Sequence, residues 1–176
     1  MDPESRPPVV IKDYDPQWPV MYEEMRSRLL SLLGPRVVRI EHVGSTSVPG
    51  LGAKPVIDMM LGVEDLTSAD QCLEIMKLEM GVFDFNAEPE NDEWFYCVGD
   101  KTSQDLRNRY HLHLVKYPSP FWDKHIRFRD ILRSHAGVAD AYCRLKKDLA
   151  KKYGTDRMGY NQAKTEFIET TIASHP

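Results

Sequence analysis

The sequence predicts an α+β protein, with a mixed β-sheet and flanking helices followed by a C-terminal helical cap. Three observations lead to this class. Short β-branched and aromatic runs alternate with helix-period segments as far as Val115. The chain after Pro118 has helical periodicity and residues typical of helix starts. The length of 176 residues suits one domain, which we expect over 9–176 after a polar, disordered lead-in at 1–8.

Each predicted element rests on a local pattern. Apolar residues at helical spacing predict the helices, and Gly34 and Pro35 end the first of them. Ser119, before Pro120, and Asp156 are expected to cap two of the later helices. In chain order we expect a short strand at 9–11, a helix at 18–33, strands at 37–43 and 55–63, a helix at 68–80, strands at 83–85, 94–98 and 111–115, a polar loop at 99–108 before the last of these strands, and helices at 119–134, 138–153 and 156–171.

Composition narrows the class of protein. No apolar run approaches the roughly 20 residues of a membrane span. The three cysteines are widely spaced and form no CxxC pair, which argues against a disulfide framework or a zinc ribbon and favours a cytoplasmic location. The net charge of −4 argues against a nucleic-acid partner.

The charge is unevenly distributed along the chain. Residues 1–100 carry 8 basic and 19 acidic residues, whereas residues 101–176 carry 15 and 8. Two interpretations stay open: a cleft that receives a polyanion, or basic helices that face solvent. We expect Lys146, Lys147, Lys151 and Lys152 to be solvated, and Trp18, Trp94 and Trp122 to pack in the core or at its rim.

The stretch from 40 to 61 carries the chemistry. Gly44 allows a ligand to approach the backbone, and Ser45 and Thr46 offer hydroxyls and amides that suit a phosphate. Asp58 interrupts a nearly apolar strand, where an ionised carboxylate costs several kcal/mol unless it is paired or bound to metal. Asp58 therefore requires a partner.

Two histidines alternate on a later strand, so that their imidazoles lie on the same face. His111 and His113 are interpreted either as metal ligands, a general base or phosphate contacts near Asp58, or as a hydrogen-bonded pair on a half-exposed sheet face. His42 is expected to brace the loop that follows it.

Basic side chains elsewhere are candidate phosphate contacts. Lys54 precedes the Asp58 strand, Arg129 lies on a basic helix face, and Lys164 lies on a largely apolar stripe of the last helix. For each of them a solvated surface position is the alternative, and Lys164 could instead reach the cleft and pair with Asp58 or a phosphate.

These motifs resemble the GrpB family of predicted nucleotidyltransferases. The resemblance is carried by the residues 41–51, 54–58, 111–113, 128–130 and 163–168. It implies a polymerase-β-like nucleotidyltransferase fold, in which a Gly-Ser pair is followed by two carboxylates at alternate strand positions that hold Mg²⁺ against substrate phosphates.

The sequence departs from that pattern at Met60, where the second carboxylate would stand. A thioether is a poor ligand for a hard cation, so we expect a strand histidine to replace the missing group. The resemblance then implies transfer of a nucleotide to a small molecule, or a catalytically reduced module that binds a nucleotide or phosphorylated metabolite linked to coenzyme A or nucleotide metabolism. The expected catalytic residues are Asp58, His111 and His113; the expected Mg²⁺ ligands are Asp58 and His113; the expected contacts to a nucleoside triphosphate are Gly44, Ser45, Thr46, Lys54, Arg129 and Lys164.

Overall fold

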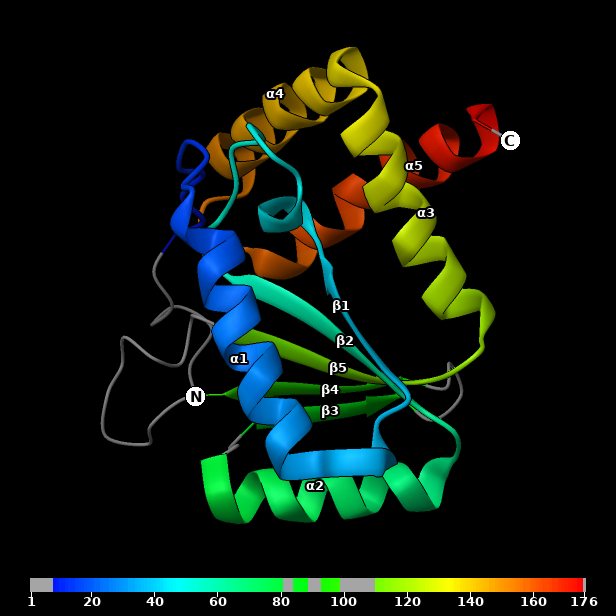
Figure 1. Ribbon diagram of the computed structural model, residues 1–176. Coiled ribbons are helices and arrows are strands. Elements are labelled where there is room, and N and C mark those ends of the chain that lie inside the picture. Colours follow the sequence, from blue (N-terminus) through cyan, green and yellow to red (C-terminus); the bar gives the residue numbers. More distant parts are fainter. Residues whose placement is uncertain (1–7, 81–83, 89–92, 99–109, 176) are drawn as a thin grey trace.

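A five-stranded mixed β-sheet lies at the centre of the fold (Figure 1). The computed structural model describes residues 8–80, 84–88, 93–98 and 110–175. The strand order is β1-β2-β5-β4-β3, in which β2 and β5 run parallel and the other neighbours are antiparallel. The strands span Arg39–Val43 (β1), Ile57–Val63 (β2), Asp84–Glu88 (β3), Glu93–Val98 (β4) and Tyr110–Lys116 (β5).

Strand register brings together side chains that are distant in the sequence. Asp58 on β2 is paired with Val43 on β1 and with His111 on β5. Met60, two residues further along, is paired with His113. Because side chains two residues apart point to the same face of a sheet, all five side chains share one face.

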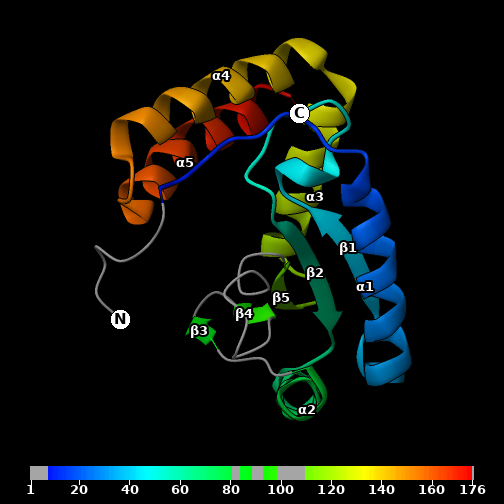
Figure 2. The ribbon, with the colours of Figure 1, turned by 90° about the vertical axis from the view of Figure 1, so that its left-hand side faces the viewer.

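Two helices cover the opposite face of the sheet. Helix α1 (Gln17–Leu33) and helix α2 (Leu66–Met80) lie against it, as Figures 1 and 2 show. Their buried side chains form one cluster with those of the central strands, in which Leu29, Met59 and Leu112 are fully buried. Because this apolar layer covers one face of β2, the side chain of Asp58 lies on the other face.

Three helices form the expected cap. Helices α3 (Pro120–Ser134), α4 (Ala136–Tyr153) and α5 (Arg157–Ser174) follow one another at the C-terminal end of the chain. Ser119 accepts a hydrogen bond from the backbone N–H of Trp122 at 3.2 Å, and Asp156 accepts one from Gly159 at 2.9 Å. Both predicted caps are therefore confirmed. Figure 2 shows α4 and α5 above the end of the sheet where β2 begins.

The prediction of a strand at 9–11 is wrong. The sheet-like pairing in this region is one isolated bridge between Lys12 and Ala53. Val9 instead packs against Leu149 and Tyr160 of the cap, so the apolar run serves packing and not a strand. The expected loop at 99–108 and most of the lead-in lie outside the described residues.

Candidate functional site

The bend between β1 and β2 forms one wall of the site. Gly44 has a φ of 68° and is followed by a single 3₁₀ turn, Ser45–Ser47. A methyl group added at Gly44 would overlap Oδ2 of Asp58. A glycine is required here for two reasons, because L-residues rarely adopt this φ and because the carboxylate lies directly against the bend.

Asp58 lies between the bend and the two imidazoles of β5. Its Oδ1 is 3.0 Å from Nδ1 of His111 and 3.9 Å from Nε2 of His113. Burial raises the pKa of the Asp58 carboxyl, but hydrogen bonds from both histidines outweigh burial and hold this pKa well below its usual range. The partner that the sequence required for Asp58 is therefore a pair of imidazoles, and the side chain of Asp58 remains 30% exposed.

Met60 lies on the same sheet face as Asp58 but is covered by apolar side chains. Its side chain is fully buried and packs with Val43, Val115 and Trp122. The position of the second carboxylate in the nucleotidyltransferase pattern is thus part of an apolar cluster between the sheet and α3. Replacing Met60 by aspartate would place a carboxylate in this apolar cluster, where its charge is costly to bury.

The donor set does not fit a two-magnesium centre. Mg²⁺ prefers oxygen ligands in octahedral geometry, whereas the described residues supply one carboxylate and two imidazoles. His111 uses Nδ1 for its contact with Asp58. Among the residues that the structure describes, no group of three or more His, Cys, Asp or Glu side chains is arranged to hold a metal ion.

Two lysines from separate segments act on the same site. Lys54 lies in the loop between the bend and β2, and Lys164 extends from α5 with its Nζ 4.5 Å from the centre of the Tyr160 ring. Burial lowers the pKa of Lys164, the charge of Asp58 raises it, and the charge of Lys54 lowers it. Both of these charges are therefore within electrostatic range of the Lys164 ammonium.

Thr46 faces inward. Its buried hydroxyl donates to the carbonyl of Val56 at 3.0 Å and lies 3.1 Å from Nε2 of His42. Burial lowers the pKa of His42 to about 4, so the ring is neutral near pH 7, and it stacks on Tyr22. The prediction that His42 braces the loop is confirmed, and Thr46 links the bend to the start of β2. Because the hydroxyl of Thr46 is used in these contacts, the predicted phosphate contact of Thr46 would be made by its backbone N–H.

Arg129 is also part of the support of the bend. Its guanidinium donates to Glu41 at 2.8 Å, to the carbonyl of His42 at 3.1 Å and to Asp130 at 2.8 Å. Arg133, one turn further along α3, donates twice to the carbonyl of Ser47. Arg129 and Arg133 therefore hold β1 and the 3₁₀ turn in place.

Lys146 corrects a prediction from the sequence. It is 3% exposed, whereas Lys147, Lys151 and Lys152 are exposed as expected. Its Nζ donates to the carbonyl of Gly52 at 2.5 Å. Burial lowers the pKa of Lys146 to about 7. The sequence does not distinguish Lys146 from the other three lysines of α4, because the acceptor of its hydrogen bond is a backbone carbonyl 94 residues away.

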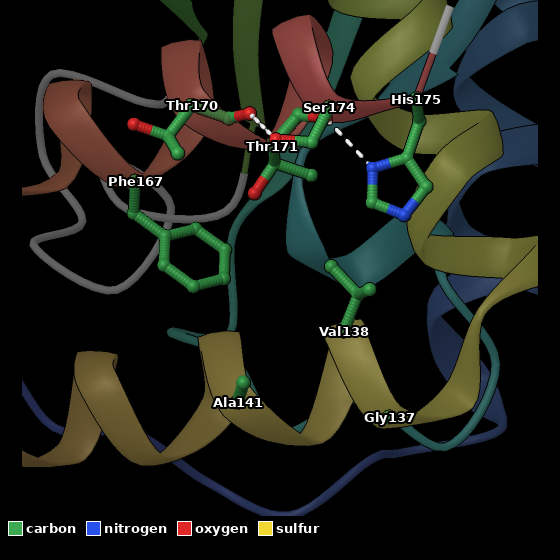
Figure 3. Close-up of a pocket in the computed structure, with 8 residues that line it drawn as sticks. All are labelled: Gly137, Val138, Ala141, Phe167, Thr170, Thr171, Ser174 and His175. Carbon is green, nitrogen blue, oxygen red and sulfur yellow. Dashed lines mark hydrogen bonds between the residues drawn. The ribbon is translucent and has the colours of Figure 1, made fainter.

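A separate hollow opens between α4 and α5 near the C-terminal end of α5. Figure 3 shows its lining, in which Val138 and Ala141 face Phe167 and Thr171. It shares no lining residue with the Asp58 site. No helix in the described part of the chain is long and apolar enough to cross a membrane.

Comparison with solved structures first defines the class of fold. The chain matches the MgGTP-bound Cid1 poly(U) polymerase with a TM-score of 0.54 and 18% identity, over 80% of this chain and 44% of that one. It matches the GLD-2/RNP-8 complex with a TM-score of 0.57 and 14% identity, over 86% and 58%. Identities this low show the fold alone, and that fold is nucleotidyltransferase-like.

The family follows from the sequence comparisons. The family model described as "GrpB protein" matches residues 8–174, and the chain therefore belongs to the GrpB family. The crystal structure of GrpB from Enterococcus faecalis matches with a TM-score of 0.75 and 26% identity, over 94% of this chain and 96% of that one. The prediction of family and fold from the sequence is confirmed.

Curated relatives differ in length. The chain is 31% identical to the glutamate-rich protein GrpB of Alkalihalophilus pseudofirmus over 93% of this chain and 94% of that protein. It is 33% identical to the UPF0157 protein YqkA of Bacillus subtilis over 89% of this chain, and it spans 44% of YqkA. A segment of 73 residues is 41% identical to part of the dephospho-CoA kinase of Mycolicibacterium paratuberculosis, covering 40% of this chain and 18% of that enzyme.

Proposed function

We propose that the site at Gly44, Ser45 and Asp58 binds a nucleoside triphosphate and transfers its nucleotidyl group to a small molecule. The observation that carries this proposal is the position of Asp58, which lies against the bend and between two imidazoles. The nucleotidyltransferase-like fold and the MgGTP bound by the Cid1 poly(U) polymerase support a nucleotide as substrate.

The residues have distinct roles in this proposal. Backbone amides of the bend and the ammonium groups of Lys54 and Lys164 hold the phosphates. The acceptor hydroxyl attacks the α-phosphorus, and the bond from phosphorus to the pyrophosphate oxygen breaks. An imidazole of β5 accepts the hydroxyl proton, and Asp58 orients the His111 ring through Nδ1 and stabilises the imidazolium that forms.

Magnesium is assigned no step. The sequence predicts a Mg²⁺ ion on Asp58 and His113, and this stays a prediction. An ion bound there would neutralise phosphate charge, but the protein supplies it one carboxylate and one imidazole, so substrate oxygens and water would have to complete its coordination.

The direct test combines binding and turnover. Isothermal titration with ATP, GTP, UTP and CTP measures binding, and release of pyrophosphate in the presence of small hydroxyl acceptors measures transfer. Asp58→Asn should abolish pyrophosphate release, because the amide cannot stabilise an imidazolium. Asp140→Asn, at an exposed position on α4, is the matched control. A folded sample that binds no nucleotide would sink the proposal.

A second candidate is a binding module without turnover. The burial of Met60 favours it, because the second metal ligand of the nucleotidyltransferase pattern is absent from this site. Its ligand would be a nucleotide or a phosphorylated metabolite, and the partial match to dephospho-CoA kinase puts dephospho-CoA and coenzyme A on the panel. Tight binding of one of these compounds, with no pyrophosphate released from any triphosphate, would favour this candidate.

A further inference from the structure

We propose that this site binds the phosphates of its ligand directly through its own cations, and that binding does not require a divalent metal. The inference deepens the proposed function, since it concerns the same site, and it sets this chain apart from an enzyme that holds its substrate through Mg²⁺. Three structural observations support it.

The first observation concerns how Asp58 is satisfied. A carboxylate that serves as a metal ligand needs its oxygens directed at the ion. Here Oδ1 already contacts His111 at 3.0 Å and lies 3.9 Å from His113, while Oδ2 lies against Gly44. The imidazoles of β5 therefore already satisfy this carboxylate without a metal.

The second observation is the balance of charge. Lys54 lies in the loop that leads from the bend into β2. Lys164 lies on α5 one turn before Phe167, which packs against the cluster that contains Val48 and Leu51 of the segment after the bend. The charges of Asp58 and Lys54 both act on the Lys164 ammonium. Met60 adds no negative charge and is sealed in the apolar cluster with Trp122. Ammonium groups near the bend attract phosphate oxygens and disfavour a divalent cation, whereas a site with three carboxylates does the reverse.

The third observation is the origin of the cations. Lys164 is held on the ring of Tyr160 at 4.5 Å, and its helix begins at a cap made by Asp156. Lys54 lies in the loop whose neighbouring carbonyl, that of Gly52, is bonded by Lys146. Both ammonium groups thus belong to segments fixed by other contacts, which lowers the entropy lost when they bind an anion.

Tripolyphosphate and ATP, each titrated in excess EDTA and again in excess Mg²⁺, test the inference. We expect both to bind in EDTA, with an affinity at least equal to that in Mg²⁺, and to bind more weakly as salt is raised. Lys164→Met should weaken binding in EDTA by about tenfold or more. Lys151→Met, which removes an exposed ammonium from the neighbouring helix α4, should leave it unchanged.

Asp58→Asn separates the two modes of binding by the sign of its effect. If the phosphates meet the protein's cations directly, removing a nearby negative charge keeps or strengthens the binding of tripolyphosphate. If a metal bridges Asp58 and phosphate, the same change abolishes binding. Thermal melting followed by circular dichroism checks that each variant is folded.

Failure of this inference differs from failure of the proposed function. Nucleotide that binds in Mg²⁺ but not in EDTA would overturn direct binding and leave the proposed function in place. Tripolyphosphate that binds in EDTA while no nucleotide binds would support direct binding and sink the nucleotide as ligand. No binding of either compound in EDTA overturns the inference.

Discussion

Replacing Lys146 by methionine should change how stability depends on pH. Lys146 is 3% exposed, and its amine bonds the carbonyl of Gly52 in the loop that leads to β2. Burial lowers the pKa of this amine from 10.5 to about 7. The folded state therefore disfavours protonation of the amine, whereas the unfolded chain does not. Methionine fills similar space and does not titrate.

The sign and magnitude follow from proton linkage. Between pH 7 and pH 10.5 the unfolded state binds more protons at Lys146 than the folded state, so stability rises with pH over this window. Integrated from about pH 6 to about pH 9, the rise is about 2–3 kcal/mol. The penalty is largest below pH 7, where both states are protonated. The lost hydrogen bond to Gly52 adds a nearly constant offset.

Urea unfolding at several pH values, followed by tryptophan fluorescence, measures the effect. The free energy of unfolding of the wild type minus that of Lys146→Met should increase by this amount, while other titrating groups cancel in the difference. Lys151→Met, whose side chain is 82% exposed, should give a difference that is flat with pH. If the difference for Lys146→Met is also flat with pH, the lowered pKa of the Lys146 amine is refuted.

Three further predictions concern the bend and its support. Gly44→Ala should cost about 1–3 kcal/mol and abolish nucleotide binding in isothermal titration, since its methyl group would overlap the site carboxylate; Gly50→Ala, with a φ of 79° and open space around it, should show the backbone strain without the loss of binding. Arg129→Met should lower the free energy of unfolding by about 1–3 kcal/mol in urea unfolding, because Glu41 loses its buried arginine partner and keeps only the exposed Arg39. Adding Glu41→Gln should recover part of that loss, and no recovery would contradict the pairing. Thr46→Val should cost about 1–3 kcal/mol but leave the affinity for tripolyphosphate unchanged, and a large loss of affinity would place its hydroxyl on the ligand.

Much of the site was predictable because its signals are local. Gly44 and Asp58 belong to one continuous segment, and a carboxylate in an apolar strand requires a partner wherever the strand lies. His111 and His113 share a face through the two-residue period of a strand. The caps at Ser119 and Asp156 likewise depend on residues three positions apart, and the structure confirms both.

Other positions could be assigned only in the folded protein. Arg129 looked like a candidate ligand contact on a basic helix face, yet its partners are Glu41 and the carbonyl of His42, nearly 90 residues away. Lys146 looked like one more solvated lysine. In both cases the sequence contains the donor but does not show which distant carbonyl or carboxylate it meets.

By itself the sequence determined the family, the nucleotidyltransferase-like sheet with its cap, and the residue types available at the bend and on β5. The tertiary structure decided what those residues contact. Asp58 contacts the imidazoles of β5, Met60 is buried in a cluster with Trp122, and Lys164 lies within electrostatic range of Asp58. The physical reason is that strand periodicity and helix capping act over a few residues. Burial and charge, which govern what a carboxylate or an ammonium group can bind, depend on contacts between segments that only the fold brings together.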